Sequence, residues 1–331
     1  QFEKALEKKP DNRNYLLEKG NILYQLGRYA DLKDFTLNTE SLLSGEPLYW
    51  NLCGHSRFYL GNLREASEFY RKAALLARDN PVFFLNAAKA LEASAETKEA
   101  VSFYAESSVL FFRQERYADA NDTASLALKK ADPGSEEFMK AESVAAKILF
   151  HEKKYKKAGE KFKALISLDS QSCGSEIFFL YGLVQLEKGK NARAAELIRK
   201  ACEREDYYLY WYKLAEIDYY MGRDCKEALS KAYSLAPDDC WVNNLMGEAA
   251  LARGESMDAE RYLEKAYNSS PDSPERIPAF NYSEALVRNG KRDEAIHVLE
   301  TITPGADVLI RKGRIYGLSG DEEAEGEAYR K

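Results

Sequence analysis

The stretch PLYWNLCGHSRFYLGNLREASEFYRKAALLARDN, residues 47–80, decides the fold. It holds two glycines seven residues apart, Gly54 and Gly61, and an alanine, Ala66, twelve residues after the first glycine. Apolar residues recur at three- and four-residue spacing on both sides of Gly61, which is typical of two amphipathic helices joined by a short turn. We therefore expect Gly61 to end the first helix in the left-handed conformation that glycine adopts readily.

The same spacing recurs along the chain. Glycine pairs seven residues apart are Gly20/Gly27, Gly54/Gly61, Gly182/Gly189, Gly247/Gly254 and Gly313/Gly320, and in Ala215/Gly222 and Ser283/Gly290 another small residue replaces the first glycine. A glycine inside a helix costs up to about 1 kcal/mol relative to alanine. We therefore interpret the first small residue as the point where a neighbouring helix comes close. An alanine usually follows it by twelve: Ala66, Ala100, Ala158, Ala194, Ala259 and Ala295.

This pattern resembles the tetratricopeptide repeat family. Residues 47–80 carry Trp50, Gly54, Ala66, Tyr70 and Ala73 in family positions, and residues 240–273 carry Gly247, Ala259, Ala266 and Pro271. The resemblance covers almost the whole chain. It implies an all-α fold, a right-handed superhelical solenoid of antiparallel helix pairs, each with an A helix followed by a B helix. The lysine- and tyrosine-rich composition favours a bacterial multi-repeat protein.

The expected array is irregular in the middle. We predict helix pairs at 13–46, 47–80, 139–172, 175–207, 208–239, 240–273, 276–305 and 306–331, with a shortened B helix in the pair at 208–239. Between residues 81 and 138 we expect three helices, at 82–94, 98–114 and 117–131. The turn-forming sequence ADPGS places a boundary at 132–135, which predicts an N-terminal array, 1–132, and a C-terminal array, 133–331. One continuous solenoid with a degenerate copy is the alternative.

Both ends of the sequence resemble parts of repeats. In QFEKALEKKPDN, residues 1–12, Ala5 and Pro10 stand where Ala266 and Pro271 stand, so the chain is expected to start inside a repeat; the alternative is that this short helix is a cap. The last repeat is predicted to be incomplete. A segment before Gln1 would then carry any signal or anchor. This favours a bacterial periplasmic or lipid-anchored protein, with a cytoplasmic location as the alternative.

Composition and motifs argue against several classes of function. The net charge of −6 offers no basic excess for nucleic acid, and no run approaches the ~18 apolar residues of a membrane span. Five cysteines without a CxxC motif argue against a disulfide framework or a zinc site, although a Cys173–Cys202 bridge is worth testing. The three histidines lie in different repeats, and neither a phosphate-binding glycine loop nor a GxSxG motif occurs. We expect no cofactor, no metal and no enzymatic activity.

The resemblance implies a concave groove, lined by the A helices, that holds an extended peptide or a partner helix. The groove positions are Asn21, Tyr24, Asn51, His55, Phe58, Tyr59, Phe179, Tyr212, Glu216, Tyr219, Tyr220, Glu248 and Glu284. Some family members bind chaperone tails through a lysine and asparagine clamp. Here Leu17 and Leu52 stand where the clamp needs lysine and a second asparagine, so we do not expect chaperone-tail binding.

The densest aromatic stretch is YYLYWYKLAEIDYYMG, residues 207–222, in which seven of sixteen residues are Tyr or Trp. One helix cannot bury all of these rings. We interpret Tyr208 and Trp211 as residues of the core and of inter-repeat packing, and we place Tyr212, Tyr219 and Tyr220 in or near the groove. Full burial of the last three would contradict this interpretation.

These observations predict a non-enzymatic scaffold that binds a peptide or partner protein. An aromatic groove with an acidic edge, Glu187, Glu216, Glu248 and Glu284, would suit a segment that combines apolar residues with Lys or Arg. Two alternatives stay open. One is a self-assembling structural protein that forms a homodimer through its solenoid ends, and the other is a small-ligand-binding accessory protein of a transport system.

Overall fold

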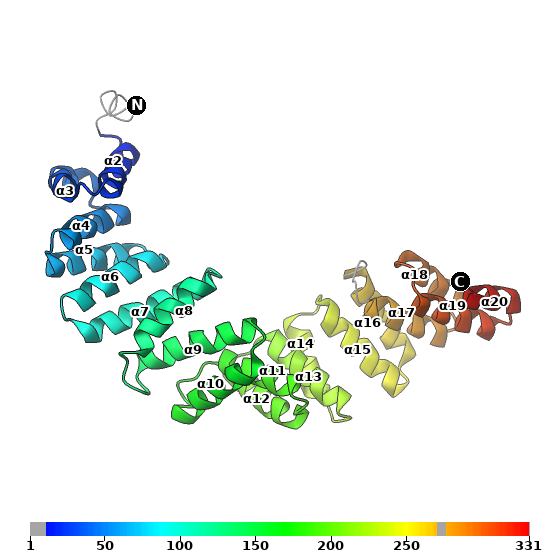
Figure 1. Cartoon of the computed structure of the whole chain (residues 1–331). Helices are drawn as coiled ribbons and strands as arrows, with labels where there is room; N and C mark the ends of the chain where they lie inside the picture. The colour runs from blue at the N-terminus through cyan, green and yellow to red at the C-terminus, as the bar shows by residue number, and fades with distance from the viewer. Residues whose placement is uncertain (1–10, 270–275, 331) are drawn as a thin grey trace. The chain divides into compact units, whose positions relative to one another are not determined.

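A computed structural model describes residues 11–269 and 276–330, and within these ranges the chain forms nineteen α-helices and no strand (Figure 1). The helices are α2 (Arg13–Gln25), α3 (Tyr29–Leu43), α4 (Pro47–Tyr59), α5 (Leu63–Leu76), α6 (Pro81–Ala93), α7 (Thr97–Arg113), α8 (Tyr117–Leu128), α9 (Glu136–His151), α10 (Tyr155–Leu168), α11 (Ser175–Glu187), α12 (Asn191–Arg204), α13 (Tyr208–Tyr220), α14 (Lys226–Leu235), α15 (Cys240–Arg253), α16 (Ser256–Ser269), α17 (Ile277–Arg288), α18 (Arg292–Thr301), α19 (Ala306–Ser319) and α20 (Glu322–Arg330). The fold is an all-α solenoid of helix pairs. The predicted B-helix end at Ala5 and Pro10 lies outside the described residues.

The turn inside each pair contains one residue in the left-handed conformation. The second glycine of every predicted pair has a positive φ, from 66° at Gly222 to 83° at Gly61. In the turn between α4 and α5, the N–H of Asn62 donates to the carbonyl of Arg57 at 2.9 Å. This bond satisfies a carbonyl at the end of the A helix that has no partner within the helix. The left-handed glycine expected from the sequence is confirmed.

Three turns adopt the same geometry without glycine. Ala95, Glu115 and Lys153 have φ values of 68°, 59° and 58°. Each is followed by the same type of bond, for example from the N–H of Glu96 to the carbonyl of Leu91 at 2.8 Å. The left-handed conformation costs a residue with a Cβ atom roughly 1–2 kcal/mol. The packing of the helices therefore imposes this turn, and glycine only makes it easier to form.

The first small residue of each glycine pair lies where two helices touch. A Cβ atom on Gly54 would lie 2.5 Å from the ring of Tyr70, and one on Gly247 would lie 2.3 Å from Cγ of Leu263. Both partners belong to the B helix of the same pair. At Gly20, in contrast, the nearest atom is Cδ1 of Leu52, on the following A helix, at 2.7 Å. The expected close approach is confirmed at each of these positions.

Helix α7 has two roles in the middle of the chain. It is joined to α6 and to α8 by the same left-handed turn, at Ala95 and Glu115. It therefore acts as the B helix of α6 and as the A helix of α8. Its Tyr104 and Phe111 are nearly fully buried in one core with residues of α6, α8 and α9. The three helices predicted between residues 81 and 138 are present.

The chain divides into two compact units, unit 1 (Gln1–Cys173) and unit 2 (Gly174–Lys331). The turn at 132–135, predicted to separate two arrays, lies inside unit 1 between α8 and α9. Ala127 of α8 and Ala141 of α9 are both fully buried in the same core. The division between the compact units therefore does not coincide with the boundary predicted from the ADPGS sequence.

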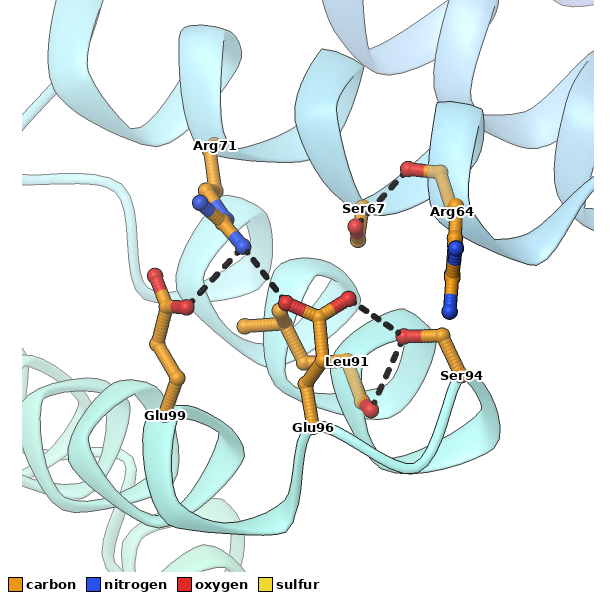
Figure 2. A network of polar contacts seen from close by, with 7 residues as sticks. All are labelled: Arg64, Ser67, Arg71, Leu91, Ser94, Glu96 and Glu99. Carbon is orange, nitrogen blue, oxygen red and sulfur yellow. Dashed lines mark hydrogen bonds and ion pairs between the residues drawn. The ribbon is translucent and has the colours of Figure 1, made fainter.

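A polar network ties one repeat to the next inside unit 1 (Figure 2). The guanidinium of Arg71, on α5, lies 3.1 Å from a carboxylate oxygen of Glu96 and 2.9 Å from one of Glu99. The other oxygen of Glu96 accepts a hydrogen bond from the hydroxyl of Ser94 at 3.0 Å. Glu96 and Ser94 flank the strained residue Ala95, so the network holds this turn against the preceding B helix.

Helix α14 is short for a B helix, as the sequence predicts, and α18 has the same length. Helix α14 has 10 residues, whereas α5, α12 and α16 each have 14. It begins at Lys226, four residues after Gly222, while α5 begins two residues after Gly61. The N–H of Lys226 is capped by Oδ1 of Asp224 at 2.9 Å. The missing first turn leaves space between α14 and α15.

Within residues 11–269 and 276–330, no disulfide joins Cys173 to Cys202. None of the helices in the described ranges is both long and apolar enough to cross a membrane.

We predict that Gly54→Ala destabilises unit 1 by about 1–3 kcal/mol, because the new methyl group must displace the buried ring of Tyr70. Thermal and urea unfolding followed by circular dichroism would measure the change. Gly45→Ala is the control, because nothing lies within 4 Å of a Cβ atom there. Equal stability of the two variants would contradict the prediction.

We predict that Ala95→Gly stabilises unit 1 by about 0.5–1 kcal/mol. Glycine relieves the strain of the left-handed conformation, and its greater loss of backbone entropy on folding offsets part of this gain. The matched control is Gly61→Ala, at the same turn position and with open space around the added Cβ, which should destabilise unit 1. Urea unfolding of both variants checks the opposite signs, and a loss of stability in Ala95→Gly would refute the strain argument.

Candidate functional site

In unit 1, the predicted groove residues of α2 and α4 meet in an aromatic cluster. The ring of Tyr24 stacks on the ring of His55 with centroids 4.0 Å apart, and it lies 6.0 Å from the ring of Tyr59. Tyr59 also stacks on Tyr29 of α3 at 4.3 Å. Phe58 touches Tyr59 edge to face at 5.6 Å. The structure therefore brings Tyr24, His55, Phe58 and Tyr59 together.

The imidazole of His55 is held on both sides. Nδ2 of Asn51 donates to Nε2 at 2.9 Å. Because that amide nitrogen can only donate, Nδ1 carries the proton of the neutral ring and donates to the hydroxyl oxygen of Tyr70 at 2.8 Å. Burial lowers the pKa of His55 from 6.5 to about 4. His55 is therefore neutral at pH 7 and acts as a link between α4 and α5.

Two predicted groove residues are largely covered by neighbouring helices. Asn51 is buried, and its Oδ1 accepts a hydrogen bond from Asn86 of α6 at 2.9 Å. Phe179 belongs to the core, because its ring packs on Tyr210 of α13 with centroids 4.7 Å apart. Little of either side chain is available to a partner. Asn21 is half-buried on α2.

In unit 2, α13, α15 and α17 surround a pocket of about 350 Å³, here called the Glu248 pocket. It is lined by Tyr212, Lys213, Glu216, Tyr220, Trp241, Asn244, Leu245, Glu248 and Ile277. Tyr220 is 70% exposed, and Tyr212 is half-buried. Full burial of Tyr212, Tyr219 and Tyr220 would have contradicted a surface role for them. The structure does not bury all three.

Hydrogen bonds orient the acidic side chains of this pocket. Glu216 accepts from the hydroxyl of Tyr212 at 2.8 Å and from Nζ of Lys213 at 2.6 Å. Glu248 accepts from the hydroxyl of Tyr220 at 3.3 Å. Burial and the Glu248 carboxylate raise the pKa of Tyr220 to about 12, so its hydroxyl stays protonated and donates.

Tyr219 faces a different opening from Tyr212 and Tyr220. Its hydroxyl donates to the backbone carbonyl of Glu248 at 3.4 Å. Its ring lines a pocket of about 470 Å³, here called the Cys225 pocket, which lies where the first turn of α14 is missing. The other residues of that pocket are Arg223, Asp224, Cys225, Lys226, Leu229, Ser230, Met246, Ala249, Ala252, Arg253 and Glu255. The three predicted tyrosines therefore do not form one site.

The burial of the aromatic stretch differs from the expectation in one respect. Tyr208 and Trp211, interpreted as residues of the core and of inter-repeat packing, are half-buried, and Tyr210 is the buried ring. The ring of Tyr210 is covered because it packs on Phe179 of α11, a contact that the spacing within α13 alone does not reveal. Trp241 and Ile277 of the Glu248 pocket were not predicted. Their only sequence signal is their place in the first turns of α15 and α17.

Glu284 lies on α17 but not in the Glu248 pocket. Its carboxylate accepts from Nε of Arg288 at 2.9 Å, an ion pair one helical turn apart. Across residues 11–269 and 276–330, no group of three or more His, Cys, Asp or Glu side chains is placed to hold a metal ion.

Comparisons with known proteins agree with the geometry. Residues 1–31 and 48–80 each match a family model of the tetratricopeptide repeat. A "TPR repeat-containing protein" of Treponema pallidum (strain Nichols) is 29% identical over 332 residues, which cover 96% of this chain and 40% of the relative. This chain therefore spans about two fifths of that relative's length.

Two solved structures are also similar. The APC/C hetero-tetramer Cut9–Hcn1 aligns with a TM-score of 0.48 at 13% identity, over 99% of this chain and 88% of that one. MamA aligns with a TM-score of 0.43 at 20% identity, over 52% of this chain and 92% of that one.

We predict that His55 makes unit 1 less stable in mild acid. Between pH 6.5 and about 4, the imidazole takes up a proton in the unfolded chain but not in the folded one, so the free energy of unfolding falls as the pH falls. Across this pH window, the unfolding temperature of the wild type should fall more steeply than that of His55→Gln, whose side chain cannot be protonated. Parallel curves for the two proteins would contradict the prediction.

Proposed function

Because this chain is a tetratricopeptide repeat protein, and arrays of such repeats serve as protein-interaction scaffolds, we propose that it binds a segment of a partner protein on the groove face of its A helices. The observation that carries this proposal is the Glu248 pocket. There, aromatic rings with polar tips and carboxylates from α13 and α15 line one opening. Exposed Tyr and Trp side chains contribute much of the binding energy at protein interfaces, because they combine a large apolar area with a hydrogen-bonding group.

The aromatic cluster of unit 1 supports a second contact area for the same kind of partner. Tyr59 is 51% exposed, although its ring already stacks on Tyr29. The hydroxyl of Tyr59 gives this surface hydrogen-bonding capacity, and His55, neutral and bonded on both sides, adds no formal charge. Unit 1 would therefore favour apolar and aromatic residues of a partner.

The proposed chemistry is binding without catalysis. The titratable side chains of the Glu248 pocket are held by hydrogen bonds to neighbouring side chains. The neutral His55 is fixed between Asn51 and Tyr70. Neither arrangement contains a nucleophile beside a general base, as acyl or phosphoryl transfer would require.

A second candidate is self-association, which the exposed apolar side chains of α19 and α20 favour. Ile310, Leu318 and Tyr329 are each at least half exposed, with values of 52%, 59% and 50%. Exposed apolar side chains on neighbouring helices favour association with another protein surface. Light scattering over a range of protein concentrations distinguishes a homodimer from a monomer, and Ile310→Lys/Leu318→Lys would separate any dimer.

We predict that Tyr212→Ala/Tyr220→Ala lowers capture of a groove partner at least about tenfold, because each lost aromatic contact weakens binding by roughly 1 kcal/mol or more. The measurement is affinity capture from a lysate of the source organism, quantified by mass spectrometry, with folding checked by circular dichroism.

The matched control is Tyr233→Ala/Tyr262→Ala, which removes two rings that touch each other at 5.5 Å on the B helices α14 and α16. Equal capture of a partner by the wild type and both double variants would place the interface outside the groove. Capture of no protein other than further copies of this chain would favour self-association.

A further inference from the structure

The carboxylate of Glu248 is an anion surrounded by neutral donors. Its Oε1 accepts from Nδ2 of Asn244 at 2.8 Å and from Nδ2 of Asn281 at 2.7 Å, and its Oε2 accepts from the hydroxyl of Tyr220 at 3.3 Å. No lysine or arginine in the described ranges forms an ion pair with it. The side chain is thus fixed in place while its charge is left without a counter-ion.

The other predicted acidic residues on these helices differ from Glu248. Glu216 is paired with Lys213 at 2.6 Å, and Glu284 is paired with Arg288 at 2.9 Å. Each ion pair joins residues three or four positions apart on one helix, so it forms without any partner. Glu248 is the carboxylate of this set that a cation from outside could neutralise.

The walls of the pocket suit a long basic side chain. Tyr220 and Trp241 contribute aromatic rings, and Leu245 and Ile277 contribute apolar surface. Lys and Arg combine an apolar stem with a charged head, and a cation over an aromatic ring is attracted by the electrons of its face. The volume of about 350 Å³ is sufficient for one such side chain.

Lys213 determines which end of the pocket remains available. Its Nζ lies 5.2 Å from the ring centroid of Tyr212 and 2.6 Å from Glu216. An internal cation therefore already occupies the Tyr212 and Glu216 end, and it would repel a second positive charge there. Within residues 11–269 and 276–330, no lysine or arginine pairs with Glu248 or lies over the ring of Tyr220 or Trp241.

We propose that the Glu248 pocket binds a lysine or arginine side chain of the partner segment, with the positive charge on the Glu248 carboxylate and the stem against Tyr220 and Trp241. This inference rests on the proposed function, since the basic side chain belongs to the groove partner. It assigns a specificity to one pocket, which the general scaffold role does not.

The experiment starts from a displayed library of random peptides selected on the immobilised wild-type protein. Peptides that bind are synthesised, and each Lys or Arg is replaced in turn by norleucine, which keeps the apolar stem without the charge. Affinities are measured by fluorescence polarisation against the wild type, Glu248→Gln and Glu284→Gln. The glutamine at position 248 can still accept the bonds from Asn244 and Asn281, so the pocket keeps its shape.

The expected result is that one basic residue of the peptide is required. Its replacement by norleucine and the Glu248→Gln change should each weaken binding about tenfold or more. The norleucine peptide and Glu248→Gln combined should lower affinity little more than either change alone, because both remove the same interaction. Glu284→Gln should change affinity less than about twofold, since Glu284 already has Arg288.

Two other outcomes overturn different parts of the argument. If peptides bind the wild type but tolerate norleucine at every basic position, or bind Glu248→Gln equally well, the cation pocket is refuted and the scaffold function stands. If no peptide is enriched over the bare matrix, both the peptide-binding groove and the cation pocket are refuted.

Discussion

The constraint on which the structure depends is the left-handed residue in the turn between an A helix and its B helix. This residue reverses the chain in a few residues and lets the next backbone N–H bond back to the end of the A helix, as from Asn62 to Arg57. The two helices must then lie close together, which a small residue such as Gly54 permits. The turn and the close approach therefore occur together. Seven residues separate the small residue in the A helix from the left-handed residue that ends it.

The candidate site follows from the same geometry. Gly247 lets Leu263 pack against α15, and this contact determines the rotation of that helix about its axis. The next residue, Glu248, consequently points away from the B helix towards α13 and α17, where Tyr220 and Asn281 reach it. The position of the unpaired carboxylate is therefore a result of how α15 packs.

Periodicity and spacing were enough to predict the helix pairs, the left-handed turns, the close contacts at the small residues and the short α14. They were not enough to predict which groove positions stay accessible. Phe179 is covered by Tyr210, and Tyr219 lies in the Cys225 pocket, because both depend on how side chains of neighbouring helices interlock. The environment of Glu248 could not be predicted from the sequence either, because Asn281 comes from the next repeat, 33 residues away.

The turns without glycine are not scattered: Ala95, Glu115 and Lys153 lie in the turns α6–α7, α7–α8 and α9–α10 of unit 1, and of the turns between α6 and α10 only α8–α9 contains a glycine with positive φ, Gly134. In a solenoid each repeat contacts only its neighbours, so strain in adjacent turns accumulates locally and is not shared by the whole chain. Local opening has a free energy that reflects such differences. Amide hydrogens of α7 and α8 should accordingly exchange with solvent sooner than those of α4 and α5, which makes the middle of unit 1 the segment where unfolding of this array begins.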